Sequence, residues 1–134
     1  MNDLPGRRPS DSDVPHDLLY TMPQGRVVEK PWGFELWWAV TALYAAKTIA
    51  VRAGHALSLQ YHETKMETLH LASGRVLLRL GDDQCEMNPG AVVTIPPGTV
   101  HRIHAITAAT IVEVSTPHLE DVVRLEDMYG RLPR

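Results

Sequence analysis

Two histidines, a glutamate and a glutamine stand at spacings that could place them around one metal ion. Gln60 and His62 are separated by one residue, Glu67 follows after four more, and His101 lies in a later segment. Side chains two positions apart in a β-strand share a face, so a strand over 58–62 would point Gln60 and His62 the same way. Two imidazoles, a carboxylate and a carboxamide oxygen form a ligand set for a divalent transition metal, with positions left for water or substrate.

The same alternation predicts how these ligands meet. A strand over 67–71 would place Glu67 opposite His62 across a strand pair, and His101 would close the site from the far wall. His70 and His104 have the opposite parity to Glu67 and His101, so they are expected on the outer face.

A metal-free alternative exists for the same residues. A buried His–Glu hydrogen bond could fill the interior of a barrel without any ion. Burying a carboxylate and several polar groups without a cation is costly, however, and this favours a metal site. Gln60 could also orient a water molecule or donate to Glu67 instead of ligating. The donor set suits Zn, Mn, Fe, Co or Ni and does not choose among them.

Length and composition indicate one soluble globular domain. The chain has 134 residues, with 44% hydrophobic and 22% charged residues, which suffices for a buried core. A net charge of −3 offers no basic surface for nucleic acid or an anionic membrane. The single Cys85 excludes an internal disulfide, and the polar N-terminus shows no secretory signal. We expect a cytoplasmic protein.

Glycine and proline divide the chain into many short strands. Residues 1–26, rich in proline and polar residues, are expected to form a tail, residues 27–117 a barrel, and residues 118–134 a C-terminal extension. Propensity alone would allow a helix over 36–47, but aromatic and β-branched residues there favour strands. Expected strands cover residues 34–40, 44–52, 57–62, 67–72, 75–80, 84–87, 92–95, 100–106 and 109–115. Many short strands with such turns indicate a sandwich or barrel.

The C-terminal extension is the least defined part of this prediction. Residues 118–131 could form a helical turn or an edge strand that ends at Gly130. Their charged side chains are expected to pair with one another or with the outside of the barrel: Glu120, Asp121, Arg124, Glu126, Asp127 and Arg131.

The two blocks around the ligands resemble the motifs of the cupin superfamily. The first motif, G-x5-H-x-H-x3,4-E-x6-G, matches at Gly54, His62, Glu67 and Gly74, with Gln60 in place of the first histidine. The second, G-x5-P-x-G-x2-H-x3-N, matches at Gly90, Pro96, Gly98 and His101, with Ala105 in place of the asparagine. The resemblance implies an all-β fold, a single cupin barrel (a double-stranded β-helix or jelly roll).

A narrower resemblance covers roughly residues 27–131. The segments KPWG (30–33), LSLQYH (57–62), PPGTVHR (96–102), IVEVSTP (111–117) and EDVVRLEDMYGR (120–131) are similar to the C-terminal cupin domain of type II mannose-6-phosphate isomerases. That subfamily also carries glutamine at the position of Gln60. It reads close to H-H-H-R-A-E-H-W where this chain reads HETKMETL over 62–69, so the metal ligands correspond while the residues between them only partly do.

The resemblance implies a metal-dependent aldose–ketose isomerase of a sugar phosphate or a sugar-like molecule. Within the motif, Glu63, Lys65 or a metal-bound hydroxide would act as the base. Lys65, Arg102 and Lys47 are candidates for binding the substrate. The alternatives are another metal-assisted reaction (cyclase, dehydratase, epimerase or oxygenase) in natural-product metabolism, or a cupin that binds metal and ligand without turnover.

The partner of the protein is expected to be a second copy of itself. Leu59 and Tyr61 alternate with Gln60 and His62, so they should face outward from the strand. Such an outer face in a small barrel is often covered by a second subunit, and a homodimer is therefore predicted.

Overall fold

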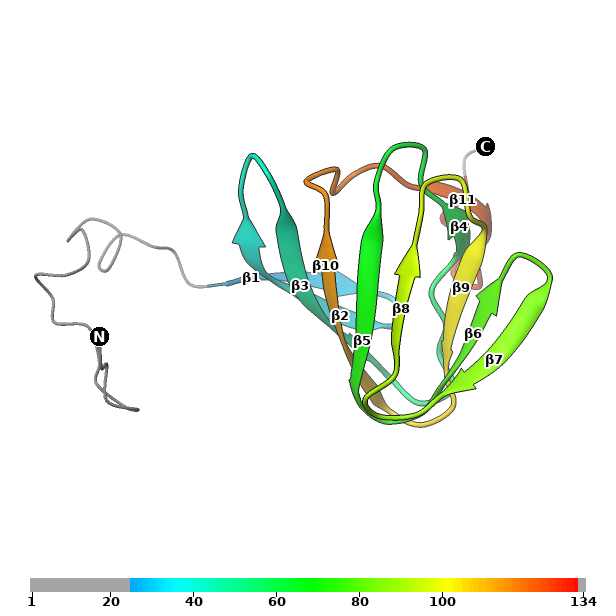
Figure 1. The fold of residues 1–134 in the computed structure, drawn as a ribbon. Helices are drawn as coiled ribbons and strands as arrows, with labels where there is room; N and C mark the ends of the chain where they lie inside the picture. Colours follow the sequence, from blue (N-terminus) through cyan, green and yellow to red (C-terminus); the bar gives the residue numbers. More distant parts are fainter. Residues whose placement is uncertain (1–24, 133–134) are drawn as a thin grey trace, which may run out of the picture.

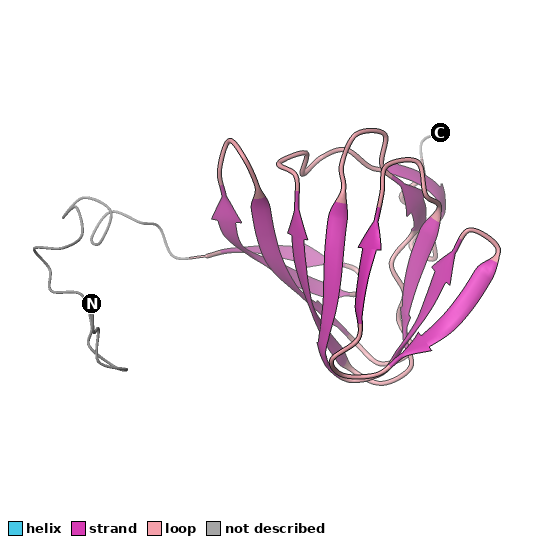
Figure 2. Ribbon diagram, viewed as in Figure 1, coloured by secondary structure: helices cyan, strands magenta, loops and turns pink. Residues whose placement is uncertain are grey.

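The computed structural model describes residues 25–132 as two antiparallel β-sheets that face each other (Figures 1 and 2). The six-stranded sheet has the order β1-β2-β3-β10-β5-β8, and the five-stranded sheet has the order β11-β4-β9-β6-β7. This arrangement confirms the predicted cupin jelly roll. None of the described residues forms a helix long and apolar enough to span a membrane.

Most strands lie where glycine and proline predicted them. Their bounds are β2 Gly33–Val40, β3 Ala45–Val51, β4 Leu59–Tyr61, β5 Glu67–Ser73, β6 Val76–Leu80, β7 Asp83–Met87, β8 Val92–Ile95, β9 His101–Ala105 and β10 Ala109–Ser115. The helix alternative over 36–47 is therefore wrong. The segment instead forms two paired strands joined by a turn, in which the side-chain hydroxyl of Thr41 accepts hydrogen bonds from the backbone N–H groups of Leu43 and Tyr44.

Two further strands frame the sheets. Strand β1 (Arg26–Lys30), which the sequence did not predict, pairs along its whole length with β2. Strand β11 (Val123–Glu126) resolves the two alternatives for the C-terminal extension, because it is an edge strand paired with β4. The extension thus completes the five-stranded sheet.

The strand pairing differs from the expected one at the site. The segments around His62 and Glu67 do not pair: β4 lies between β11 and β9, whereas β5 lies between β10 and β8 in the opposite sheet. His101 does not lie on a far wall either, because Gln60 of β4 pairs directly with His101 of β9. The turn that follows β4 carries the chain across to the other sheet, so the two ligand-bearing segments face each other instead of lying side by side.

The hydrophobic core fills the space between the inner faces of the two sheets. It is built of alternate residues of the strands together with Trp32 and Leu57, as the period of two requires. Its other members are Ile49, Val51, Leu69, Leu71, Val76, Leu78, Met87, Ile95, Ile103, Ala105, Ala109 and Ile111. The charged residues of the site lie in the same interior space, beside this core.

Two further expectations concern the N-terminal tail and the surface predicted to form a homodimer. Most of the predicted tail, residues 1–24, lies outside the described residues, and Arg26 already belongs to β1. Leu59 is buried and Tyr61 half-buried within the single chain, so these two residues do not form the uncovered surface on which the homodimer was predicted. The homodimer and the domain bounds remain predictions.

Candidate functional site

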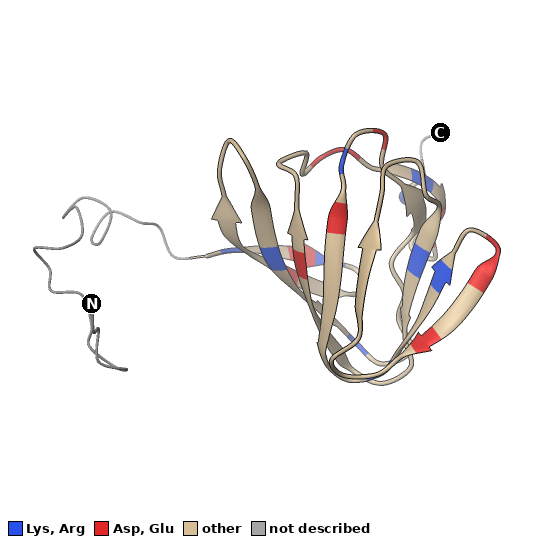
Figure 3. Cartoon of the chain, viewed as in Figure 1, with Lys and Arg blue, Asp and Glu red and all other residues tan. Residues whose placement is uncertain are grey.

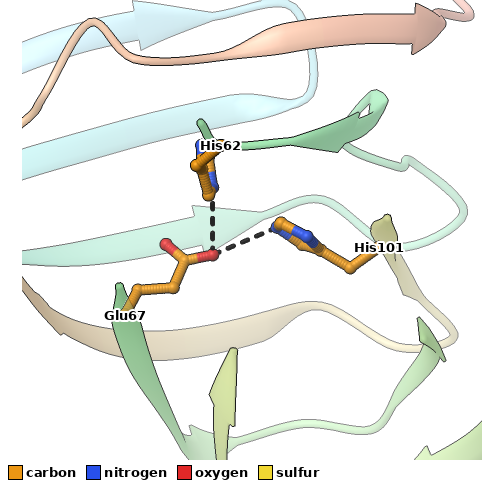
Figure 4. A group of neighbouring side chains, drawn as sticks. All are labelled: His62, Glu67 and His101. Atoms are coloured by element: carbon orange, nitrogen blue, oxygen red, sulfur yellow. Dashed lines mark hydrogen bonds and ion pairs between the residues drawn. The ribbon is translucent and has the colours of Figure 1, made fainter. Parts of the chain in front are cut away.

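Three buried side chains from the two sheets converge on one point (Figure 4). The Nε2 atom of His62 lies 3.2 Å from Oε1 of Glu67, and Nε2 of His101 lies 3.1 Å from the same oxygen. One ligand atom from each residue lies within 4.8 Å of the others. His62 and His101 come from the end of β4 and the start of β9, and Glu67 reaches them from β5 of the facing sheet.

The backbone sets the orientation of both imidazole rings. Nδ1 of His62 lies 2.6 Å from the carbonyl oxygen of Asp121, and Nδ1 of His101 lies 2.8 Å from that of Thr99. A carbonyl oxygen only accepts, so Nδ1–H is the donor in each ring, and a neutral ring then carries a lone pair on Nε2. This tautomer is the one in which a histidine presents Nε2 to a metal.

The contacts around Glu67 leave a place for a cation. A lone pair on Nε2 and a carboxylate oxygen repel each other at about 3 Å unless a proton or a metal lies between them. Nε2 of His101 is buried and has no hydrogen-bond partner among the described residues, and such an unpaired buried group is costly. The three side chains therefore fit a metal ion in their residue types, tautomers and spacing.

Asp121 holds the turn that carries His62. Its carboxylate accepts hydrogen bonds from three consecutive backbone N–H groups, those of Glu63, Thr64 and Lys65. The N–H groups of Glu63 and Thr64 hold the pKa of Asp121 down at about 2. Asp121 was expected to pair with other charges or with the outside of the barrel, and that expectation is wrong: one residue orients the His62 ring through its carbonyl and the adjacent turn through its carboxylate.

A chain of buried ion pairs continues from Glu67 across the six-stranded sheet. Figure 3 shows acidic and basic positions on neighbouring strands of this sheet. Lys65 Nζ lies 3.1 Å from Oε2 of Glu67 and 3.0 Å from Oε2 of Glu113. Lys47 Nζ lies 3.7 Å from the same oxygen of Glu113 and 3.1 Å from Oε2 of Glu35. Acidic and basic groups thus alternate from β2 through β3 and β10 to β5.

The pKa values in this chain follow from burial and from the neighbouring charges. Burial alone would raise the pKa of Glu67. The contacts with His101 and His62, which stabilise the carboxylate only where Nε2 carries a proton, and the charge of Lys65 outweigh burial, so this pKa lies below its usual range. Burial and the negative charge of Glu67 raise the pKa of Glu113 to about 7. Burial would lower the pKa of Lys65, yet the carboxylates of Glu113 and Glu67 raise it. Lys65 is therefore an ammonium group at neutral pH.

The ion-pair chain carries one unbalanced negative charge when its members are ionised. Three carboxylates (Glu35, Glu67 and Glu113) face two ammonium groups (Lys47 and Lys65). An uncompensated charge in the interior is unfavourable. A proton on Glu113, whose pKa is about 7, relieves this excess near neutral pH; a cation bound beside Glu67 would relieve it as well.

A solvent-connected cavity opens beside the triad. His62, Gln60, Lys65, Glu113 and Lys47 all line it. The remaining lining residues come from the β1–β2 hairpin, β3, the segment before β4 and the C-terminal extension: Lys30, Trp32, Glu35, Trp37, Ile49, Leu57, Ser58, Leu119, Asp121, Val122, Arg124 and Arg131. A small molecule in this cavity would therefore contact His62 of the triad and members of the ion-pair chain.

The structure brings some of the predicted site residues into this cavity and leaves others outside. Gln60, Lys65 and Lys47 line it, and Oε1 of Gln60 accepts a hydrogen bond from the Ser58 hydroxyl at 2.7 Å. The Glu63 side chain is exposed and does not line the cavity. Arg102 lies on the outer side of β9, where it donates to the Leu57 carbonyl and pairs with Glu126 at 3.5 Å. The roles proposed for these five residues remain predictions.

Sequence reasoning missed Glu35, Glu113 and the inward position of Arg124. The signal for Glu113 was its parity, because it shares a strand face with Ile111 and Ser115, both buried. The same test applies to Glu35, which is 5% exposed and shares a face of β2 with the buried Gly33. No comparable signal existed for Arg124, whose direction depends on the register of the edge strand β11 against β4.

Comparison with known proteins agrees with this fold. A family model described as "Cupin domain" matches residues 48–115, which include all three residues of the triad. The xanthan biosynthesis protein XanB of Xanthomonas campestris pv. campestris is 31% identical over 111 residues, which are 79% of this chain and 24% of that protein.

Two other relatives show the same partial coverage. The alginate biosynthesis protein AlgA of Pseudomonas aeruginosa is 30% identical over 131 residues (89% of this chain, 27% of that protein). The mannose-1-phosphate guanylyltransferase ManC of Salmonella typhimurium is 30% identical over 112 residues (80% and 23%). This chain thus spans about a quarter of the length of these curated relatives.

Solved structures share the fold at lower identity. The Streptomyces protein PAC13, solved with uridine, superposes with a TM-score of 0.68 at 16% identity, covering 80% of this chain and 88% of that one. KdgF from Halomonas sp. gives 0.63 at 18% identity (74% and 90%). CapF from Staphylococcus aureus gives 0.66 at 20% identity (87% and 35%). At these identities the likeness establishes the architecture.

Proposed function

Because this chain belongs to the cupin family, we propose that it is a metal-dependent enzyme for a small molecule, most concretely an isomerase of a sugar phosphate or a sugar-like compound. The observation that carries the proposal is the convergence of His62, Glu67 and His101, with both Nδ1–H groups held by backbone carbonyls and Nε2 of His101 unpaired. The motif resemblance to type II mannose-6-phosphate isomerases supports the choice of reaction.

His62, Glu67 and His101 would hold the ion, with Gln60 as the predicted fourth ligand. A divalent cation supplies Lewis acidity: it polarises a carbonyl and a neighbouring hydroxyl and so acidifies the hydrogen on the carbon between them. The protein contributes preorganisation, because Asp121 and Thr99 fix the rings and Lys65 fixes the second oxygen of Glu67.

Lys65 has a defined role in this arrangement. Its raised pKa keeps it protonated. Toward a ligand in the cavity it would therefore act as a hydrogen-bond donor and a counter-charge, not as a base. Glu63, the other predicted acid–base residue, would have to turn inward from its exposed position on the turn to reach a substrate.

This last observation favours a second candidate function. Of the two predicted acid–base residues, one is protonated and one lies outside the cavity. A cupin that binds a metal and a ligand without turnover would need neither residue as a base. The two functions share the metal site and differ in whether any substrate is converted.

The experiment combines metal content with turnover. We expect about one transition metal per chain in the purified wild type, and its loss in His101→Ala and Glu67→Ala. His70→Ala is the matched control, because His70 lies on the same strand as Glu67 and is exposed on the other face. Each variant is then assayed for conversion of mannose 6-phosphate to fructose 6-phosphate with Zn, Mn, Fe, Co or Ni.

The outcomes separate the candidates. Metal and metal-dependent turnover, both lost with the triad, support the isomerase. Metal without conversion supports the binding protein. A wild type that takes up none of the five metals contradicts both, and leaves the histidines and Glu67 as internal polar groups of the barrel.

A further inference from the structure

Three cationic side chains that do not belong to the ion-pair chain line the same cavity. Lys30 comes from the end of β1, Arg124 from β11, and Arg131 from the C-terminal segment. Arg131 is balanced, because it makes two side-chain hydrogen bonds to the carboxylate of Asp127, at 3.0 and 2.7 Å. Among the described residues, neither Lys30 nor Arg124 forms an ion pair.

Arg124 carries an unused donor inside the protein. Its Nε atom is buried and has no hydrogen-bond partner among the described residues. A guanidinium group usually donates from several N–H groups, so a buried Nε without an acceptor is unfavourable. Burial and the nearby charge of Arg131 lower the pKa of Arg124, and burial lowers the pKa of Lys30, to which Lys47, Arg124 and Arg131 add. Glu35 acts in the opposite direction on both groups, and Asp127 does so on Arg124, but neither the Lys30 nor the Arg124 pKa is restored to its usual value.

The strand register places this positive region close to the triad. Arg124 pairs with Gln60 across β11 and β4, and Gln60 pairs with His101 across β4 and β9. Residues paired in adjacent strands share a face and lie about 5 Å apart, so two such steps separate Arg124 from His101 by about 10 Å at the backbone. Both Arg124 and Gln60 line the same cavity.

We propose that Arg124 and Lys30 form a subsite that binds the oxyanion group of a small ligand, a phosphate monoester or a carboxylate, whose other end reaches the triad. An oxyanion would supply the acceptor that Nε of Arg124 lacks and a direct ion-pair partner for both cations. A planar guanidinium group suits such an anion because its N–H groups can donate to two oxygens at once. The ligand must be compact. The backbones of Arg124 and His101 lie about 10 Å apart, and their side chains span part of that distance.

This subsite adds a substrate contact to the proposed function. It rests on that function only for the part of the ligand that would bind at the triad. It also revises the expected substrate contacts. Arg102, predicted to bind an anionic group, lies on the outside of β9. Lys47 and Lys65 are already paired with carboxylates. Arg124, expected to pair with other charges or with the outer surface, is instead the arginine that points into the cavity beside Gln60.

The test measures binding of inorganic phosphate and, separately, of acetate to metal-stripped protein by calorimetry at constant ionic strength. We expect saturable binding of at least one anion to the wild type. Arg124→Gln should raise its Kd at least about tenfold, the loss expected for one hydrogen bond to a charged group. Lys30→Gln should weaken it less, and Arg124→Lys should fall between Arg124→Gln and the wild type. Arg79→Gln, which removes an arginine outside this cavity, should bind like the wild type.

Two further measurements keep this result separate from folding and from the metal. Arg124→Gln without anion should melt at or above the wild-type temperature, because it removes a charge that burial and Arg131 disfavour; a large fall in Tm would show a structural role and overturn the subsite. His101→Ala should keep its anion binding. Loss of binding in His101→Ala, or equal binding in wild type and Arg124→Gln, would also overturn it.

The preferred anion identifies the ligand class. Tighter binding of phosphate indicates a phosphate monoester, and tighter binding of acetate indicates a carboxylic acid. Anion binding that depends on Arg124 in a protein that takes up no metal would leave the subsite standing while the proposed metal-dependent function fails. No saturable binding of either anion to the wild type overturns the subsite itself.

Discussion

Asp121 shows how much of the site depends on one residue outside the ligand set. Its carbonyl accepts from Nδ1 of His62, and its carboxylate accepts from three N–H groups of the next turn. The same residue therefore selects the imidazole tautomer and anchors the segment between two metal ligands. A neutral side chain at this position would keep the backbone contact and lose the charged one.

The pH dependence of stability should reveal this contact. The pKa of Asp121 is about 2 in the folded protein against a reference value of 3.8. A depressed folded pKa means that the stabilisation is present above about pH 3.8 and is lost as the pH falls through about 2. We therefore expect Asp121→Asn to lower Tm at pH 5 and to differ little from the wild type near pH 2.

Thermal melts of both proteins between pH 2 and 6 make this comparison, with Glu120→Gln as the control. Glu120 is exposed and adjacent in sequence, so its substitution should change Tm little at any of these pH values. A difference between Asp121→Asn and the wild type that persists undiminished down to about pH 2 would show that the carboxylate contributes no pH-linked stability.

At the scale of the elements, the turns that join the strands decide where the ligands lie. Gly54 and Gly74 both have positive φ, at 79° and 82°. A Cβ on Gly54 would meet no heavy atom within 4 Å, whereas a Cβ on Gly74 would overlap the carbonyl oxygen of Ala108. Gly74 thus allows the β5–β6 turn to pack against the segment that leads into β10.

This contrast makes a matched pair of substitutions. Gly54→Ala should cost roughly 1–2 kcal/mol, the price of a left-handed conformation for a residue with a Cβ. Gly74→Ala should cost a further ~1–3 kcal/mol, because the backbone must also shift to relieve the overlap. Urea unfolding of both variants measures the difference. Equal losses in the free energy of unfolding would mean that the overlap at Gly74 is relieved without an additional cost.

At the scale of the whole molecule, the buried ion-pair chain links strands that are distant in sequence. It runs from Glu35 on β2 to Glu67 on β5. Lys65 is its most critical cation, because it is the one that separates the carboxylates of Glu67 and Glu113. Removing one partner of such a network leaves charges buried without compensation.

We expect Lys65→Gln to destabilise the metal-stripped protein by roughly 3–5 kcal/mol. The control is Arg75→Gln, which breaks the exposed pair with Glu86, 2.7 Å apart, and should cost about 0–1 kcal/mol. Chemical denaturation at pH 7 measures both. Similar small losses in the two variants would show that the interior carboxylates relax or take up protons when Lys65 is removed.

Much of the fold and the ligand set could be predicted from the sequence because both depend on short-range patterns. Strand positions follow from alternation between glycine and proline turns, and His62, Glu67 and His101 stand out because they fall at fixed distances from the glycines and the proline of two motif blocks. Sheet assignment could not be predicted in the same way. It depends on the direction in which the turn after a three-residue strand, β4, sends the chain, and this is decided by packing between the sheets.

The positions of several charged residues were the other feature that the sequence did not predict. Glu113 and Glu35 resemble surface residues in sequence, and only the buried lysines opposite them make their interior position possible. The inward position of Arg124 depends on a β-strand pairing with a register shift at Glu126. Strand parity could have placed the two glutamates inside, but a single sequence displays neither their lysine partners nor the register of Arg124.

The division of the triad between two sheets has a thermodynamic consequence. His62 and His101 belong to one sheet and Glu67 to the other, so a cation bound by all three would tie the two halves of the sandwich together. Since the unfolded chain lacks this arrangement, each tenfold excess of free metal over Kd would add about 1.4 kcal/mol to the free energy of unfolding. The melting temperature would then follow the supply of metal, and the protein would be most easily unfolded, and degraded, where that metal is scarce.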